Sequence, residues 1–229
     1  MNEARIIELF PSVQGEGIYV GQLQLFIRFA ACNLNCAYCD TVKKGGRRYG
    51  VYELLDAIGA TDSITGIHTV SITGGEPLLH ADFLRAFLPR LRKRHFKIYL
   101  ETNGTLPGAL EGVLDSIDVI AMDMKLPSAL KGKSYWSRHG DFLRIAQRKE
   151  VFVKVVITAA TQDEEIRRAV TVIDDTNAKI PLVLQPVTPT KKFSKSVSAA
   201  RALELQRLAE IVLDDVRIIP QMHKLLGVR

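Results

Sequence analysis

The chain has 229 residues, of which 47% are hydrophobic and 24% are charged, a composition that indicates a globular fold and excludes a disordered chain. The length suits one α/β domain, so we expect residues 1–229 to form a single domain. The chain has 31 Lys and Arg residues and 25 Asp and Glu residues, which gives a net charge of +6. The basic runs KKGGRR and RLRKRH lack interleaved aromatic residues, which argues against a nucleic-acid partner.

The N-terminal segment, MNEARIIELF, carries charges where a signal peptide would have an apolar run. No later segment approaches the roughly 20 apolar residues of a membrane span. We therefore expect a cytoplasmic protein that has no membrane partner.

Seven apolar, β-branched runs along the chain predict strands, at residues 23–30, 68–73, 97–102, 118–124, 152–158, 181–186 and 216–221. Several of the intervals between them have helical periodicity, most clearly residues 76–94, 163–174 and 196–213. Strands that alternate with helices predict right-handed βαβ units, and hence an α/β fold with a parallel sheet.

Polar or glycine residues follow several of the predicted strands, in the segments ITGGEP, LETNGT, MDMKLPS and VLQPVTP. In parallel α/β folds this carboxyl edge is where ligands bind. The segment that contains the cysteines follows the first predicted strand in the same way. We therefore expect these segments to converge on one site.

All three cysteines lie in the short segment CNLNCAYCD, with the spacing C-x3-C-x2-C. An odd number of close cysteines in a reducing compartment is poorly explained by disulfides. A structural zinc site needs four ligands, and the histidines lie too far along the chain for a compact finger. A [4Fe–4S] cluster on Cys32, Cys36 and Cys39 would instead leave one iron open for a small molecule. Zinc, and three thiols packed as small hydrophobic groups, remain as alternatives.

The motif C-x3-C-x-φ-C, with Tyr38 as its aromatic residue, and the sequence GGEP after the next strand resemble the radical S-adenosylmethionine (SAM) superfamily. The resemblance implies a [4Fe–4S] cluster whose open iron binds SAM. At this length it also implies a shortened, partly open (βα)6 radical SAM barrel with parallel strands.

Three further segments, ELFPSVQGEG, FIRFAACNLNCAYCDT and PQMHKLLGVR, resemble the 7-carboxy-7-deazaguanine synthase family. The resemblance implies a lyase that converts 6-carboxy-5,6,7,8-tetrahydropterin into 7-carboxy-7-deazaguanine with loss of ammonia, for queuosine or another deazapurine. It further implies Mg²⁺ as a cofactor, a homodimer, and an electron donor such as flavodoxin or ferredoxin.

The same resemblance implies roles for individual residues. Arg28 would hold the substrate carboxylate, and the hydroxyl of Thr41 would bind Mg²⁺. The other contacts to the pterin would come from Val13, Gln14, Gly15, Glu16, Thr73 and His223. The SAM site would comprise Tyr38, Gly74, Gly75, Glu76, Asp123, Met124, Lys125, Gln185, Pro186, Val187 and Thr188.

Taken singly, many of these residues also have ordinary structural explanations. Residues 14–17 could form a polar turn, Arg28 could reach a surface carboxylate, and Thr41 could belong to a turn. Asp123 and Lys125 could form a structural ion pair, and His223 could lie on the surface or in the core.

Two features differ from the family and keep alternatives open. The sequence DMK at residues 123–125 replaces the SPK of some members and resembles a motif of glycyl-radical activating enzymes, so an activase is the alternative within radical SAM chemistry. The chain ends at Arg229 where some members end in proline, which leaves the terminal carboxylate without an assigned role. A non-enzymatic iron–sulfur or zinc protein is the alternative from a different class, but it leaves the motifs GGEP and QGEG without a function.

Overall fold

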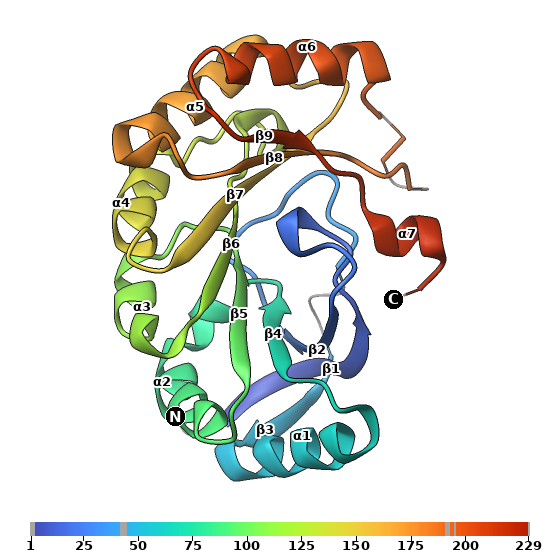
Figure 1. The fold of residues 1–229 in the computed structure, drawn as a ribbon, viewed down its shortest axis with the longest axis vertical. Helices are drawn as coiled ribbons and strands as arrows, with labels where there is room; N and C mark the ends of the chain where they lie inside the picture. The colour runs from blue at the N-terminus through green and yellow to red at the C-terminus, as the bar shows by residue number, and fades with distance from the viewer. Residues whose placement is uncertain (1–2, 42–44, 191–192, 195, 229) are drawn as a thin grey trace.

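The computed structural model describes residues 3–41, 45–190, 193–194 and 196–228, and these residues build one nine-stranded sheet (Figure 1). The strand order is β3-β1-β2-β4-β5-β6-β7-β8-β9. From β2 to β9 all neighbouring strands are parallel, whereas β1 pairs antiparallel with both β2 and β3. The sheet is open, because β3 and β9 form its two edges.

The parallel strands are β2 (Leu23–Phe29), β4 (Thr69–Gly74), β5 (Lys97–Thr102), β6 (Val119–Asp123), β7 (Glu150–Ile157), β8 (Leu182–Pro186) and β9 (Val216–Ile218). Each overlaps one of the seven runs predicted as strands. An α/β fold with a partly open, mostly parallel sheet is therefore confirmed.

The antiparallel strands β1 (Glu3–Val13) and β3 (Arg47–Gly50) were not predicted. In β1 only Ala4 and Ile6 are buried, and the remaining residues are half-buried or exposed. Such a strand has no continuous apolar run, which is the signal that identified the parallel strands.

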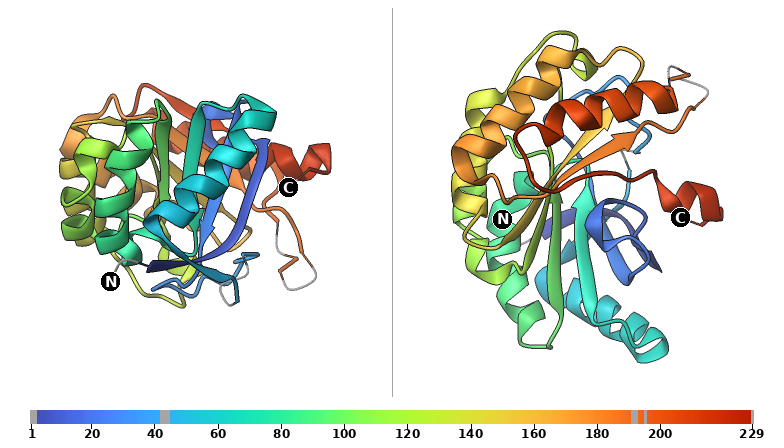
Figure 2. Two further views of the ribbon diagram at one scale, coloured as in Figure 1. Left: turned by 90° about the horizontal axis from the view of Figure 1, so that it is seen from below. Right: turned by 45° about the horizontal axis from the view of Figure 1, so that its top comes forward.

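Six helices cover the outer face of the curved sheet, and the segment after β1 lies against part of the opposite, concave face (Figures 1 and 2). There Ile18 and Tyr19 pack on a small buried cluster formed by Tyr99, Val119, Ala121, Phe152 and Val183. They are α1 (Val51–Thr65), α2 (Ala81–Arg92), α3 (Pro107–Glu111), α4 (Trp136–Ala146), α5 (Asp163–Asn177) and α6 (Ala199–Glu210). Short 3₁₀ turns lie at η1 (Gly17–Tyr19), η2 (Pro77–His80), η3 (Leu114–Ser116) and η4 (Pro127–Ala129). Of the three helical intervals predicted from periodicity, 76–94 contains α2 and 196–213 contains α6, while α5 begins with the interval 163–174 and continues to Asn177.

The core lies between these helices and the sheet. In α2, Phe83, Leu84, Phe87, Leu88 and Leu91 are all buried, at the three- and four-residue spacing of one helical face. Burying each such side chain contributes about 1.5–3 kcal/mol. Apolar residues thus bind the helices to the sheet and leave the carboxyl edge of the strands to polar residues.

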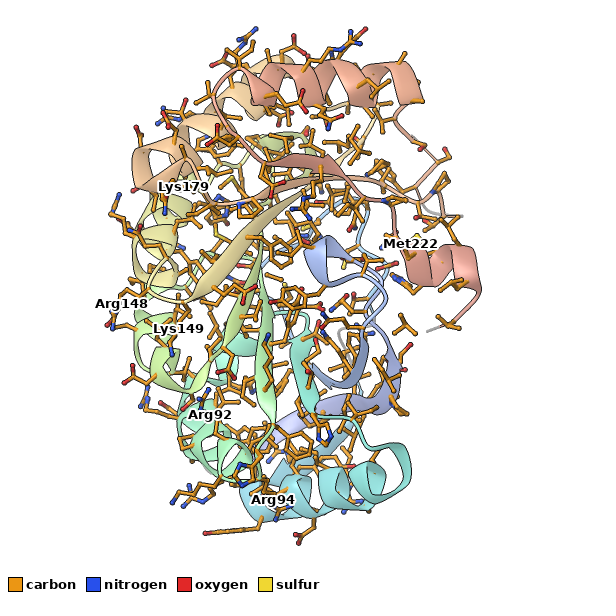
Figure 3. All side chains as sticks on the ribbon, in the orientation of Figure 1. Arg92, Arg94, Arg148, Lys149, Lys179 and Met222 are labelled. Atoms are coloured by element: carbon orange, nitrogen blue, oxygen red, sulfur yellow. The ribbon has the colours of Figure 1, made fainter. Side chains whose placement is uncertain are left out.

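The C-terminal segment after β9 returns to the concave face of the sheet, opposite the outer helices, and leads into α7 (Met222–Leu226). Figure 3 shows Met222 at the start of α7. Arg148 and Lys149 lie on the opposite side of the molecule, beside the outer helices. Within the described residues, no helix is both long and apolar enough to cross a membrane.

Candidate active site

A cavity of about 740 Å³ opens at the carboxyl ends of the parallel strands. The loop after β1, the cysteine loop after β2, the ends of β4 to β8 and the C-terminal segment all contribute to its wall. Most of the residues predicted from sequence line it: Val13, Gln14, Gly15, Glu16, Arg28, Cys32, Cys36, Tyr38, Cys39, Thr41, Thr73, Gly74, Gly75, Asp123, Lys125, Gln185, Val187, Thr188 and His223. The expected convergence of strand ends on one site is therefore what the structure shows.

Three of the predicted SAM residues, Glu76, Met124 and Pro186, are not among the residues that line the cavity. Glu76 is fully buried, and its carboxylate accepts hydrogen bonds from Leu78 N (3.0 Å), Thr102 Oγ1 (2.8 Å) and Asn103 N (2.7 Å). Burial raises the pKa of Glu76 to about 7, although these hydrogen bonds oppose the shift. In this structure Glu76 braces the end of β5 against the GGEP turn.

The cysteine loop presents three free, half-buried thiols to the cavity. Its backbone is held by a hydrogen bond from Ala37 N to Ala129 O (2.9 Å) and by a close approach to the GGEP turn. A β-carbon at position 75 would stand 1.8 Å from Ala31 O, so this approach requires glycine at position 75. Burial raises the pKa of the Cys36 thiol, an effect larger than the opposing pull of the Lys125 ammonium.

These thiols fit a multi-iron cluster. They come from one loop, face one cavity and can each bind a separate iron. In the described part of the chain, no group of three or more His, Cys, Asp and Glu side chains is arranged to hold a single metal ion. Three thiolates on one loop are the donor set of an iron–sulfur cluster with one open iron.

Three polar atoms in the cavity wall also fit a bound ligand. Tyr38 OH, Asp123 Oδ1 and Gln185 Oε1 are buried and have no hydrogen-bond partner among the described residues. Buried polar atoms in proteins are nearly always paired. A ligand with several polar groups, such as SAM, would satisfy them.

Four charged side chains form a chain of ion pairs along the cavity wall. Lys154 contacts both Glu16 and Asp123, the latter at 3.0 Å, and Lys125 contacts Asp123 at 2.7 Å. Their side chains are only 11% to 22% exposed, so water screens them little. Burial alone would raise the pKa of Glu16, but the charge and hydrogen bond of Lys154, the hydrogen bond from Gln221 and the charge of His223 together lower it to about 2.

A second polar network surrounds Glu101, at the end of β5. Its carboxylate accepts hydrogen bonds from Gln14 Nε2 (2.9 Å), Ser71 Oγ (3.3 Å) and Thr73 Oγ1 (2.7 Å). Sequence reasoning selected the segment LETNGT as part of the site but chose no residue from it. The carboxylate that follows the apolar run KIYL was the available signal.

Arg28 lies on β2 directly opposite Glu8 of β1. Its Nε donates to Glu8 Oε2 at 2.8 Å, and its guanidinium carbon lies 5.6 Å from the centre of the Phe10 ring. Because Arg28 also lines the cavity, these neighbours fix the direction in which the guanidinium faces a ligand.

The C-terminal segment ties two loops of the site together. Gln221 Nε2 donates to Glu16 Oε1 (2.7 Å), Met222 N donates to the carbonyl of the residue before Glu16 (2.8 Å), and Lys224 pairs with Asp40 (3.0 Å).

His223 of the same segment lines the cavity, and burial lowers its pKa. Gln221, Lys224 and Lys154 line the cavity too, and sequence reasoning missed them. The terminal carboxylate of Arg229 lies outside the described residues.

The sequence matches the Radical SAM superfamily over residues 26–171. It is 43% identical to a 7-carboxy-7-deazaguanine synthase of Geobacter sulfurreducens, in an alignment that covers 98% of this chain and 97% of the relative. It is 35% identical to a 7-carboxy-7-deazaguanine synthase of Methanothermobacter thermautotrophicus, in an alignment that covers 99% of this chain and 98% of the relative. The fold resembles the crystal structure of QueE from Escherichia coli, with a TM-score of 0.64 and 22% identity over 96% of this chain and 95% of that one. The fold also resembles a structure of TYW1 with a lysine-pyruvate adduct bound, with a TM-score of 0.61 and 16% identity over 83% of this chain and 74% of that one.

Proposed function

Because the chain belongs to the radical SAM superfamily and, within it, to the 7-carboxy-7-deazaguanine synthases, we propose that it converts 6-carboxy-5,6,7,8-tetrahydropterin into 7-carboxy-7-deazaguanine with loss of ammonia. The observation that carries the proposal is the set of three free thiols on one loop at the cavity, in a chain that matches such synthases over nearly its full length. The relatives support this interpretation and not the glycyl-radical activase.

Membership of this superfamily implies a [4Fe–4S] cluster and SAM. In this proposal Cys32, Cys36 and Cys39 hold three irons of the cluster. When bound, the cluster supplies the electron that cleaves the sulfonium of SAM. SAM is then held by Asp123 Oδ1 and Gln185 Oε1, which accept from its hydroxyl and amino groups, and by the neighbouring wall of Gly74, Gly75, Lys125, Val187 and Thr188.

The remaining wall suits a carboxylated pterin. The Arg28 guanidinium can bind a carboxylate through two parallel hydrogen bonds. The pyrimidine edge of a pterin carries two adjacent N–H groups, which match the two oxygens of a carboxylate such as Glu101. Thr73, His223 and residues 13–16 line the same cavity as Arg28 and Glu101.

Thr41 is our candidate for the Mg²⁺ site. Mg²⁺ prefers hard oxygen ligands and is often bound jointly by a few protein oxygens, substrate oxygens and water. Thr41 lines the cavity beside the cysteine loop, so its hydroxyl and a substrate carboxylate could share the ion.

Other features of the protein are proposed on the same footing. We propose a single radical SAM domain over residues 1–229, a homodimer, a flavodoxin or ferredoxin as electron donor, and a product used for queuosine or a related deazapurine. Free thiols that hold an oxygen-sensitive cluster suit the reducing cytoplasm, where we place the protein without a nucleic-acid or membrane partner.

The test is to incubate anaerobically reconstituted protein with SAM, a reductant, Mg²⁺ and the carboxypterin, and to detect the deazaguanine by mass spectrometry. A variant with alanine at all three cysteines is the matched control and should form no product. A loaded wild-type protein that cleaves SAM but forms no deazaguanine would contradict the proposal. Stoichiometric zinc in place of iron and sulfide would support the non-enzymatic alternative.

A further inference from the structure

A closed ring of side-chain hydrogen bonds connects the cysteine loop to the end of β5. Asn33 Nδ2 donates to Thr105 Oγ1 (2.8 Å), and Thr105 Oγ1 donates to Asn103 Oδ1 (2.6 Å). Asn103 Nδ2 then donates back to Asn33 Oδ1 (2.9 Å). Asn103 and Thr105 are 5% and 1% exposed, so water competes little for the bond between them, whereas Asn33 lies on the exposed side of the ring.

The backbone determines the orientation of the Asn103 amide. The N–H of Thr105 donates to Asn103 Oδ1 at 3.1 Å, and a backbone N–H can only donate. The oxygen of the amide must therefore face Thr105, and its NH₂ group must face the cysteine loop. This removes the usual ambiguity between the two ends of an asparagine side chain.

The NH₂ group of Asn103 has two hydrogens, and the ring uses one of them. Its nitrogen lies 4.0 Å from Cys32 Sγ, within reach of a long hydrogen bond to the large sulfur atom. The backbone N–H of Leu34 donates to the same sulfur at 3.4 Å. Cys32 is thus approached by one backbone and one side-chain donor.

We propose that Asn103 is a positioning residue for the cluster: its second amide hydrogen is directed at the Cys32 thiolate, and this contact raises the reduction potential of the bound cluster. The inference rests on the proposed placement of the cluster on the three cysteines. The reduced cluster carries one more negative charge than the oxidised one, so a donor to its sulfur stabilises the reduced form more. Asn103 itself lines the cavity, and Glu76 holds its backbone N–H.

The first experiment is an EPR redox titration of reconstituted protein without SAM or pterin. Asn103→Leu keeps a similar volume and removes the donor, and we expect about a tenfold lower ratio of reduced to oxidised cluster at a fixed potential, or about 59 mV for a one-electron couple. Asn103→Asp keeps an acceptor for Thr105 but adds a negative charge, so its potential should be lower still.

Asn33→Ala is the matched control, because it breaks the ring but leaves the Asn103 amide held by the Thr105 backbone. Its potential should shift less than that of Asn103→Leu. An unchanged potential in Asn103→Leu, or an equal shift in Asn33→Ala, would overturn the inference. Failure of wild-type protein to bind iron and sulfide would instead contradict the proposed function.

A second measurement covers the case in which Asn103→Leu does not retain a cluster. Protein with ¹⁵N in the asparagine side-chain amides is reduced and examined by pulsed EPR for nitrogen coupling to the cluster. Wild type and Asn33→Ala should both show the coupling, because Asn103 is intact in both. Its absence from wild type, or its loss in Asn33→Ala, would show that Asn103 is not the donor.

Discussion

Gly15 and His223 lie so close together that a β-carbon at position 15 would stand 2.1 Å from Nδ1 of the imidazole. The carbonyl of Gly15 also accepts a hydrogen bond from Met222 N at 2.8 Å. The loop after the first strand and the C-terminal segment therefore form one wall of the cavity, and each depends on the other for its position.

Gly15→Ala should displace the C-terminal segment while leaving the cluster spectrum unchanged. Because the displaced residues line the cavity, we expect kcat/KM for the pterin to fall on the order of tenfold, which equals about 1.4 kcal/mol. Gly108→Ala is the control, since a β-carbon there would meet nothing within 4 Å. Steady-state kinetics decide the point, and equal values for the two variants would contradict it.

Glu101→Gln should raise KM for the pterin about tenfold or more, as expected when a hydrogen bond to a charged group is lost. In the wild-type protein the NH₂ group of Gln14 donates to the Glu101 carboxylate, and in the variant this donor could face the NH₂ group of the new amide. SAM cleavage should continue without product. Glu111→Gln, at an exposed ion pair with Arg148, is the control, and loss of SAM cleavage in Glu101→Gln would place the residue in the cofactor site instead.

Arg28→Lys keeps the charge but not the planar pair of donors, so the pterin should bind about 1.5–3 kcal/mol more weakly. The kinetic result is a raised KM with SAM cleavage uncoupled from product. Arg148→Lys, at the surface pair with Glu111, should leave turnover unchanged. If SAM binding were lost while pterin binding survived, Arg28 would belong to the cofactor site.

Thr41→Ala should weaken the dependence of turnover on Mg²⁺ and leave the cluster spectrum intact, because it removes the hydroxyl oxygen proposed as a ligand. Thr41→Ser keeps that oxygen and should respond to Mg²⁺ like wild type. Titration of turnover with Mg²⁺ tests both variants. If turnover of the wild-type enzyme does not depend on Mg²⁺, Thr41 is not a Mg²⁺ ligand.

Glu76 should make the stability of the cluster-free chain depend on pH. Its pKa is raised from the ordinary 4.5 to about 7, so between these values the folded chain binds a proton that the unfolded chain releases. The unfolding free energy should fall by about 3 kcal/mol as the pH rises through this window. Urea titrations of wild type and Glu76→Gln at pH 5 and pH 8 test this, since Gln does not titrate. Equal pH dependence in the two proteins would contradict it.

The parallel strands could be predicted because strands buried on both faces are continuous apolar runs. The half-exposed β1 gives no such run, and its place in the sheet depends on pairing with β2 and β3. The motifs at strand ends identified most of the site for the same reason, because the ends of parallel strands meet at one edge.

Lys154 shows why the rest of the site could not be predicted. It lies inside the apolar run FVKVVIT, and its partners Glu16 and Asp123 are far from it in the sequence. Only the fold brings the three together. Likewise, the roles of Asn103 and Glu76 depend on hydrogen bonds between neighbouring loops, which no local pattern encodes.

The two carboxylates and two ammonium groups of Glu16, Lys154, Asp123 and Lys125 sum to zero charge in a place that water barely reaches. Replacing Lys154 alone would leave Glu16 without its ion-pair partner, and replacing Asp123 alone would do the same to Lys125, which costs about 3–5 kcal/mol. Divergence at these positions is therefore expected to proceed by paired exchanges.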